Sequence, residues 1–229
     1  MILGIDTSGA TLGVALALDG IVLASVYVHA RNSHDALLVP VIARACETCA
    51  VQPADLAGIA VSAGPGSFTG LRIGFAAAKG FALAHGTPLL AVPTFDAMAH
   101  AVHDMLPAGD TAQTLTALTD ARRGDVYVAE YMLGERVANL RPASADSALA
   151  VGARLPHGAL LCGNGAPVVE AAYPGKFRIL GVGLSASIAG AVALCGATML
   201  HEGRIADAAT CEPQYLREFQ TTVPHHGAM

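Results

Sequence analysis

The sequence predicts an α/β protein made of two similar lobes, each a mixed sheet flanked by helices. The chain has 229 residues, 53% of them apolar, so it is long enough to bury a sizeable core. Segments with strand-like alternation are interleaved with helical segments along its length. A strand–turn–strand–turn–strand unit at the start of the chain appears again from residue 115 onward. Such a duplication predicts two lobes of one architecture.

The two copies correspond position by position. The strands of the first copy are expected at residues 2–6, 12–16 and 21–29. Those of the second are expected at residues 115–119, 126–131 and 136–140. When the copies are laid over each other without gaps, Asp6 matches Asp120 and Leu12 matches Val126. Each unit therefore places an acidic residue at the end of its first strand.

Helices and further strands follow each copy. After the first we expect helices at 35–50 and 71–85 and strands at 56–62 and 88–92. After the second we expect a helix at 144–152, a strand at 159–163, a short helix at 166–173 and an apolar helix ending near residue 200. Pro107, Gly109 and Asp110 interrupt the pattern between them. This predicts a first lobe at 1–104, a second at 105–204, and a C-terminal helix within 205–229 that packs back on the first lobe.

This plan resembles the actin-like, sugar-kinase and heat-shock-protein (ASKHA) ATPase superfamily, in which two such acids face each other across a nucleotide cleft. The resemblance implies that Asp6, with Thr7 and Ser8, faces Asp120 around a cation and phosphate oxygens. The alternative is that Asp6 only makes an Asx-type turn between two strands. The sequence leaves both interpretations open.

The glycine-rich loop at residues 64–74, which reads GPGSFTGLRIG, is the most distinctive segment of the chain. It lies between an expected strand and an expected helix, where backbone N–H groups are free to bind an anion. It is not a Walker A loop, because Leu71 follows Gly70 where that motif needs Lys, and it lacks the spacing of a dinucleotide fingerprint. Gly64, Gly66 and Gly70 therefore belong either to a nucleotide loop or to a structural turn.

Composition excludes several classes of protein. The net charge of −5 and the lack of a basic run argue against a self-contained nucleic-acid groove. Five cysteines without framework spacing, and no leader-like N-terminus, predict a cytoplasmic protein. Cys46 and Cys49 lie inside a helical pattern, which favours two incidental cysteines over a redox pair. Residues 179–200 carry no charge, but they are mostly small and predict a buried helix rather than a membrane span.

Few residues point to catalysis. His100 and His103 share one helical face, but a metal site needs further ligands that the sequence does not place nearby. No serine, cysteine or lysine lies in a nucleophile motif. We therefore expect no catalytic residue and no metal site.

Five motifs occur together and in order: GIDTS at 4–8, the loop at 64–74, DARRGDVY at 120–127, GNG at 163–165 and PQYLR at 213–217. Over nearly the whole chain this resembles the bacterial tRNA threonylcarbamoyladenosine biosynthesis family TsaB, also called YeaZ. That family is a non-catalytic paralogue of TsaD, the transferase that modifies the adenosine next to the tRNA anticodon. TsaD binds a metal partly through a His-x-x-x-His pair. By order along the chain, Thr94 and Met98 stand at those positions here.

The resemblance implies a subunit that binds and activates a TsaD-type transferase, with a TsaE-type ATPase as a further partner. It implies no cofactor of its own, ATP and a metal ion bound by the partner subunits, and tRNA contact only through the complex. The alternative is an autonomous ATP-dependent phosphotransferase of the ASKHA fold that uses Asp6 and Asp120.

A partner surface is expected on the two helices of the first half. The charges of Arg72 and Lys79 mark one stripe of the second helix as outward-facing, which would leave apolar residues of that stripe on a solvated face. The expected interface residues are Leu37, Val41, Arg72, Phe75, Lys79 and Leu83. The family resemblance implies that this helical face pairs with TsaD and also with a second copy of the chain.

Overall fold

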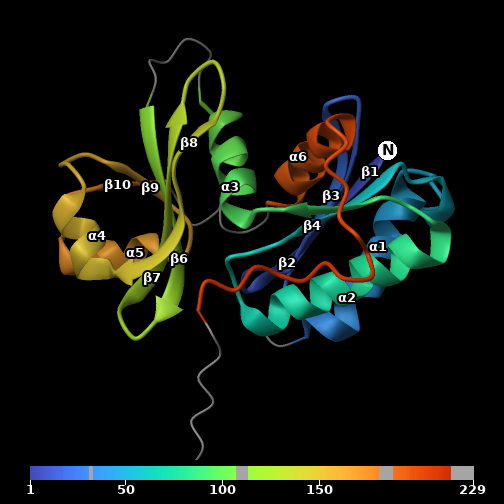
Figure 1. Ribbon diagram of the computed structural model, residues 1–229, viewed down its shortest axis with the longest axis horizontal. Helices are drawn as coiled ribbons and strands as arrows, with labels where there is room; N and C mark the ends of the chain where they lie inside the picture. Colours follow the sequence, from blue (N-terminus) through green and yellow to red (C-terminus); the bar gives the residue numbers. More distant parts are fainter. Residues whose placement is uncertain (31–32, 107–112, 181–187, 218–229) are drawn as a thin grey trace, which may run out of the picture.

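A computed structural model describes residues 1–30, 33–106, 113–180 and 188–217. They form two five-stranded mixed sheets with helices on their faces (Figure 1). The strand orders are β3-β2-β1-β4-β5 and β10-β9-β6-β7-β8. In both sheets the first strand pairs antiparallel with the second and parallel with the fourth. The expected duplication and the two-lobed α/β fold class are confirmed.

The first sheet is covered by helices on both faces. Its strands are β1 (Ile2–Asp6), β2 (Thr11–Leu18), β3 (Ile21–His29), β4 (Gly58–Ser62) and β5 (Leu89–Val92). Two helices, α1 (His34–Thr48) and α2 (Phe68–His85), bury their apolar sides against one face. Helix α6 (Ala189–His201) packs on the other face, against β1 and β4. A short 3₁₀ turn, η1 (Pro53–Asp55), precedes β4.

Helix α2 begins three residues earlier than the periodicity suggested. Ser67 caps it, because its Oγ accepts a hydrogen bond of 3.2 Å from Gly70 N. The helix ends at Gly86, which adopts a left-handed conformation with φ of 66°. The glycine loop therefore runs directly into the first turn of α2.

The second sheet repeats this plan with shorter helices. Its strands are β6 (Gln113–Arg122), β7 (Asp125–Leu133), β8 (Ala138–Ser147), β9 (Leu160–Cys162) and β10 (Arg178–Ile179). Helices α4 (Ala148–Arg154) and α5 (Ala166–Ala172) pack on one face. Helix α3 (Thr94–His103) packs on the other face through Phe95, Ala99 and Val102.

The expected division of the chain needs correction, because two helices pack on the opposite lobe. Helix α3 lies within residues 1–104 yet covers the second sheet, and α6 lies within 105–204 yet covers the first (Figure 1). The two helices also contact each other. Each lobe is therefore completed by a segment that the sequence order assigns to the other. None of the helices in the described ranges is long and apolar enough to cross a membrane.

The expected C-terminal helix is wrong for residues 205–217, which run across the first lobe in irregular conformation. Ala206 bridges to Leu89 at the edge of the sheet, and Gln214 N donates to Ala63 O at 2.7 Å. The packing of this segment on the first lobe is as expected. At its end, Arg217 reaches the second lobe and pairs with Asp125 at 2.8 Å. Residues 218–229 lie outside the described part of the chain.

Candidate functional site

A cleft of about 680 Å³ separates the two lobes. The first lobe lines it with the β1–β2 turn, the start of α1 and the glycine loop, and the second lobe with the end of β6 and Asn164. Sequence reasoning placed Ser8, Gly66, Gly70 and Asp120 at such a cleft, and all four line it. Asn164 was missed as a lining residue, although its motif was noted, because spacing alone does not bring residue 164 to the end of β6.

Asp6 lies beside the cleft but is engaged within the protein. Its side chain is 5% exposed, and its Oδ1 accepts hydrogen bonds from Ser8 N at 3.1 Å and from Ser8 Oγ at 2.7 Å. A third bond comes from Ser62 Oγ at 2.7 Å, on the neighbouring strand β4. The bond to the backbone two residues on is an Asx turn. This geometry favours the structural interpretation of Asp6.

The glycines of the loop allow close contact within the chain. A Cβ at Gly66 would lie 2.6 Å from Ser8 O, and one at Gly70 would overlap the carbonyl oxygen of Thr7. Thr7 Oγ1 donates to Gly70 O at 2.7 Å, and Ser67 N donates to Ser8 O at 2.7 Å. Gly64 has φ of 107°, and a Cβ there would meet the C-terminal segment at Gln214. The loop is therefore fastened to the β1–β2 turn and to residues 205–217, which favours the structural-turn interpretation.

The second lobe presents Asp120 at the opposite side of the cleft. Asp120 N donates to Asn164 Oδ1 at 2.9 Å, and its Oδ1 accepts from Arg122 N at 2.8 Å. The guanidinium of Arg122 lies 3.6 Å from the other carboxylate oxygen. Two lining residues, His34 and Thr119, each bury a polar side-chain atom for which the described residues provide no hydrogen-bond partner. The cleft thus retains some unsatisfied polarity between the lobes.

The two histidines of α3 have separate surroundings. His103 Nε2 lies 2.8 Å from Gly134 O, whereas burial lowers the pKa of His100, which lines a small cavity of about 70 Å³ near Cys195. Tyr131 donates to Asp96 Oδ1 at 2.7 Å, and its burial beside this carboxylate raises its pKa. Across the described ranges, no three His, Cys, Asp or Glu side chains are grouped to hold a metal ion.

The residues at the positions of the TsaD histidine pair lie in the interior. Thr94 begins α3, is fully buried, and accepts a hydrogen bond from Gly64 N at 3.0 Å through its Oγ1. Met98, one turn further along α3, is half-buried and packs against two hydrophobic clusters, one on each sheet. Both side chains therefore contribute to packing. Cys46 is buried in α1, where burial, with Cys49 nearby, raises the pKa of its thiol, which favours the incidental interpretation of the Cys46–Cys49 pair.

The structure corrects the expected partner surface at two positions. Phe75 is 3% exposed and Val41 is 9% exposed, so neither offers surface to a partner. Phe75 belongs to the buried stripe of α2 with Leu71, Ala78 and Ala82. The charge of Lys79 had suggested that its side of α2 faces solvent. Instead, the Lys79 ammonium donates a hydrogen bond of 3.4 Å to Ala209 O, so this charge does not mark a solvent-facing stripe.

The other expected surface residues vary in exposure. Leu83 is 64% exposed and Arg72 is exposed, whereas Leu37 and Lys79 are half-buried. Beside their charged residues, α1 and α2 also carry small and apolar side chains that are exposed or half-buried, and we call these the α1–α2 face: Leu37, Pro40, Ile73, Ala76, Ala77, Gly80 and Phe81. None of these side chains is fully buried.

Comparison with known proteins gives consistent matches. The family model described as TsaD, tRNA N6-adenosine threonylcarbamoyltransferase, matches residues 26–218. The tRNA threonylcarbamoyladenosine biosynthesis protein TsaB of Bacillus subtilis is 36% identical over 130 residues, which are 57% of this chain and 54% of that protein. The Escherichia coli TsaB is 37% identical over 134 residues, 58% and 56% of the two chains. The match thus spans about half the length of these two relatives. An uncharacterised protein of Mycobacterium tuberculosis, Rv3421c, is 37% identical over 180 residues, 76% of this chain and 80% of that one.

Solved structures agree over most of the chain. YeaZ from Pseudomonas aeruginosa superposes with a TM-score of 0.78 at 26% identity, covering 94% of this chain and 99% of that one. An activator of the 2-hydroxyisocaproyl-CoA dehydratase from Clostridium difficile, solved with bound ADPNP, gives a TM-score of 0.52 at 9% identity over 89% and 96% of the two chains. The latter likeness concerns the fold alone, and the fold is that of the ASKHA superfamily.

Proposed function

Because the chain belongs to the TsaB/YeaZ family and matches the TsaD family model, we propose that it is a non-catalytic subunit in the biosynthesis of N6-threonylcarbamoyladenosine in tRNA. In this role it binds a TsaD-type transferase and activates it. A TsaE-type ATPase is a further partner, and ATP and a metal ion are bound by the partner subunits. The observation that carries the proposal is the pair Thr94, which is buried, and Met98, which is half-buried; the family resemblance implies metal-binding histidines at these positions in the transferase.

The α1–α2 face supports the proposed partnership. It gathers small and apolar side chains on two adjacent helices, and such a group on a solvated face is typical of a docking surface. Ala76, Ala77 and Gly80 would let a partner helix come close to α2. Partner and second copy would use the same face, so a homodimer would compete with the heterodimer.

The experiment replaces one small residue of this face by a charged one. Ala76→Arg keeps a good helix former but places a guanidinium at the centre of the α1–α2 face. Burying that charge without a partner costs several kcal/mol, enough to move a micromolar affinity beyond detection. The variant should therefore fail to co-elute with a TsaD-type transferase and fail to support tRNA modification. The matched control is Ala171→Arg, which changes another exposed alanine, on α5 in the second lobe (Figure 1).

The assay also tests the lack of catalysis. The isolated chain should transfer no threonylcarbamoyl group, and modification should appear only when the partner enzymes are added. Co-elution of Ala76→Arg at low micromolar concentration would exclude this face, and transfer by the chain alone would exclude a non-catalytic role.

The inter-lobe cleft keeps a second candidate open. Its volume of about 680 Å³ is large enough for a nucleotide, so an autonomous ATP-dependent phosphotransferase is the alternative. Against it, Asp6 Oδ1 already accepts three hydrogen bonds from within the protein, so this oxygen of the carboxylate serves the local fold. ATP titration of the isolated chain distinguishes the two, because only the phosphotransferase requires saturable binding and release of ADP.

A further inference from the structure

The second lobe has a hollow that the cleft and the α1–α2 face do not include. Helices α4 and α5 have seven residues each, and they cover the sheet over Leu118, Val126, Val128 and Leu161. Further along the same face, Thr116 pairs with Glu130, and Glu130 pairs with Arg141 on β8. A cavity of about 550 Å³ lies over this part of the sheet, which we call the second-lobe cavity.

Arginine side chains from three elements line this cavity. Arg141 comes from β8, Arg154 from the end of α4 and Arg178 from β10, and His157 joins them from the loop after α4. A smaller cavity of about 290 Å³ shares Glu130, Arg141 and Arg154. Seven of the 13 Lys and Arg residues lie in residues 113–180, beside six acids, so this segment carries a formal charge of +1 in a chain of net charge −5.

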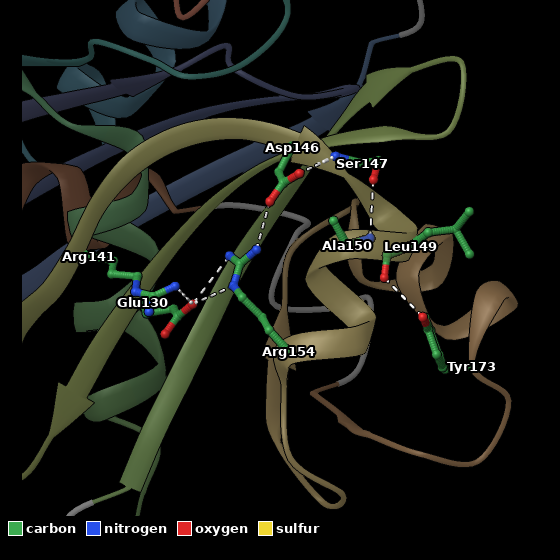
Figure 2. Close-up of polar contacts among 8 residues, drawn as sticks. All are labelled: Glu130, Arg141, Asp146, Ser147, Leu149, Ala150, Arg154 and Tyr173. Atoms are coloured by element: carbon green, nitrogen blue, oxygen red, sulfur yellow. Dashed lines mark hydrogen bonds and ion pairs between the residues drawn. The ribbon is translucent and has the colours of Figure 1, made fainter.

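Arg154 is held in place by two carboxylates (Figure 2). Its Nε and Nη2 donate to Glu130 Oε1 at 3.3 Å, and its Nη1 donates to Asp146 Oδ2 at 2.8 Å. Helix α4 is fixed as well, since Ser147 Oγ caps Ala150 N at 3.1 Å and Tyr173 donates to Leu149 O at 3.0 Å. Glu130 is neutralised by this arrangement, and its side chain is only 14% exposed.

The other two arginines retain their capacity to bind. Arg141 Nη1 lies 3.7 Å from Glu130 Oε1, beyond hydrogen-bond distance, and its side chain is 61% exposed. Arg178 is exposed, and within the described ranges it makes no ion pair. Around the cavity, three arginines (Arg141, Arg154 and Arg178) stand against two carboxylates (Glu130 and Asp146). The cavity therefore keeps one excess positive charge.

We propose that the second-lobe cavity binds a phosphate group, held by Arg141 and Arg178 with His157 and the Thr114 hydroxyl beside them. The donors approach from β6, β8, β10 and the loop after α4. A tetrahedral phosphate offers acceptor oxygens in several directions, whereas a carboxylate offers two in one plane, so convergent donors from several sides suit the phosphate better. Guanidinium groups bind phosphate through paired N–H donors.

Two sources of this phosphate are consistent with the chemistry. A tRNA would present a phosphodiester, and a small metabolite would present a free phosphate. The tRNA source rests on the proposed function, whereas the phosphate site itself does not. A direct contact of this kind would add a nucleic-acid surface to a chain whose overall charge is unfavourable for one.

The test uses the full chain and two probes. Inorganic phosphate is titrated by amide chemical-shift perturbation, and labelled tRNA by fluorescence anisotropy at several salt concentrations. Arg141→Gln and Arg178→Gln remove one charge each at exposed side chains and leave the Arg154 ion pairs intact. The matched control is Arg136→Gln, which removes the same charge from an exposed position of the same lobe outside the cavity lining.

Combining both substitutions should weaken phosphate and tRNA binding at least tenfold, with a decrease in the tRNA salt slope of about one for each lost contact. If the double variant lost phosphate binding but kept tRNA binding unchanged, the phosphate site would be supported, and tRNA would be excluded as the source of the phosphate. Equal effects of the cavity variants and Arg136→Gln, or binding of polyglutamate as tight as that of tRNA, would overturn the proposal. Co-elution with the TsaD-type partner should be unchanged in every variant, so failure here is distinguishable from failure of the proposed function.

Discussion

Gly70→Ala tests whether the glycine loop is built for contact within the chain. A Cβ at Gly70 would overlap Thr7 O on the β1–β2 turn, so the turn or the start of α2 must move. Overpacking of this kind costs about 1–3 kcal/mol. The shift would also weaken the hydrogen bond from Thr7 Oγ1 to Gly70 O, which contributes about 1 kcal/mol. The gain of about 1 kcal/mol in helix propensity offsets part of this loss.

We therefore expect Gly70→Ala to lower the free energy of unfolding by about 1–3 kcal/mol. For a chain of this size, that corresponds to a thermal midpoint lower by roughly 2–12 °C. The matched control is Gly80→Ala in the same helix, where an added Cβ meets nothing within 4 Å. There only helix propensity changes, and the midpoint should rise by roughly 2–4 °C.

Differential scanning calorimetry of the two variants and the unaltered chain measures this difference. The same chemical change in the same helix should have opposite signs at the two positions. If both substitutions raise the midpoint, the loop does not press on the β1–β2 turn. The glycines would then have to be explained by the approach of a ligand to the cleft.

Two further predictions compare residues that the sequence pattern placed in similar roles but that differ in burial in the structure. Asp6→Ala should lower the free energy of unfolding, measured by denaturant unfolding, by about 2–4 kcal/mol, because Ser62 Oγ and Ser8 Oγ lose a charged acceptor. Asp120→Ala removes a partly exposed carboxylate and should lower the free energy of unfolding by less than about 1 kcal/mol in this assay. Phe75→Ala should cost about 3–5 kcal/mol and Leu83→Ala less than about 0.5 kcal/mol. If Phe75→Ala and Leu83→Ala lowered the free energy of unfolding by similar amounts, the conclusion that Phe75 is buried would be wrong.

The fold was predictable from the sequence because its main signal is local. The alternation of large apolar residues along β2 and β7 is set by the two-residue period of a strand, and the turns between strands carry their own residue preferences. The duplication of this unit then implied two sheets of one topology. Several of the cleft residues followed from the superfamily resemblance, which implies that equivalent strand ends of the two lobes face each other.

The buried face of α2 was not predictable in the same way. The helix is rich in Ala and Gly, so its sides differ little in hydropathy, and two charges at its flank outweighed Phe75 in the pattern. Only the sheet beneath the helix decides which side is buried. For this reason the partner surface that we propose is the α1–α2 face, and it leaves out Phe75.

The sequence by itself determined most of the strands, the duplicated unit, the glycine loop and the family, although β10 was not expected and β8 runs to Ser147, into the segment expected to be a helix. Tertiary structure alone decided that α3 and α6 complete opposite lobes, that residues 205–217 cross the first lobe without a helix, and that Arg141, Arg154 and Arg178 share one cavity. The physical reason is the range of the interactions. Strand period and turn chemistry act between near neighbours, whereas packing and charge convergence join residues that the chain separates by tens of positions.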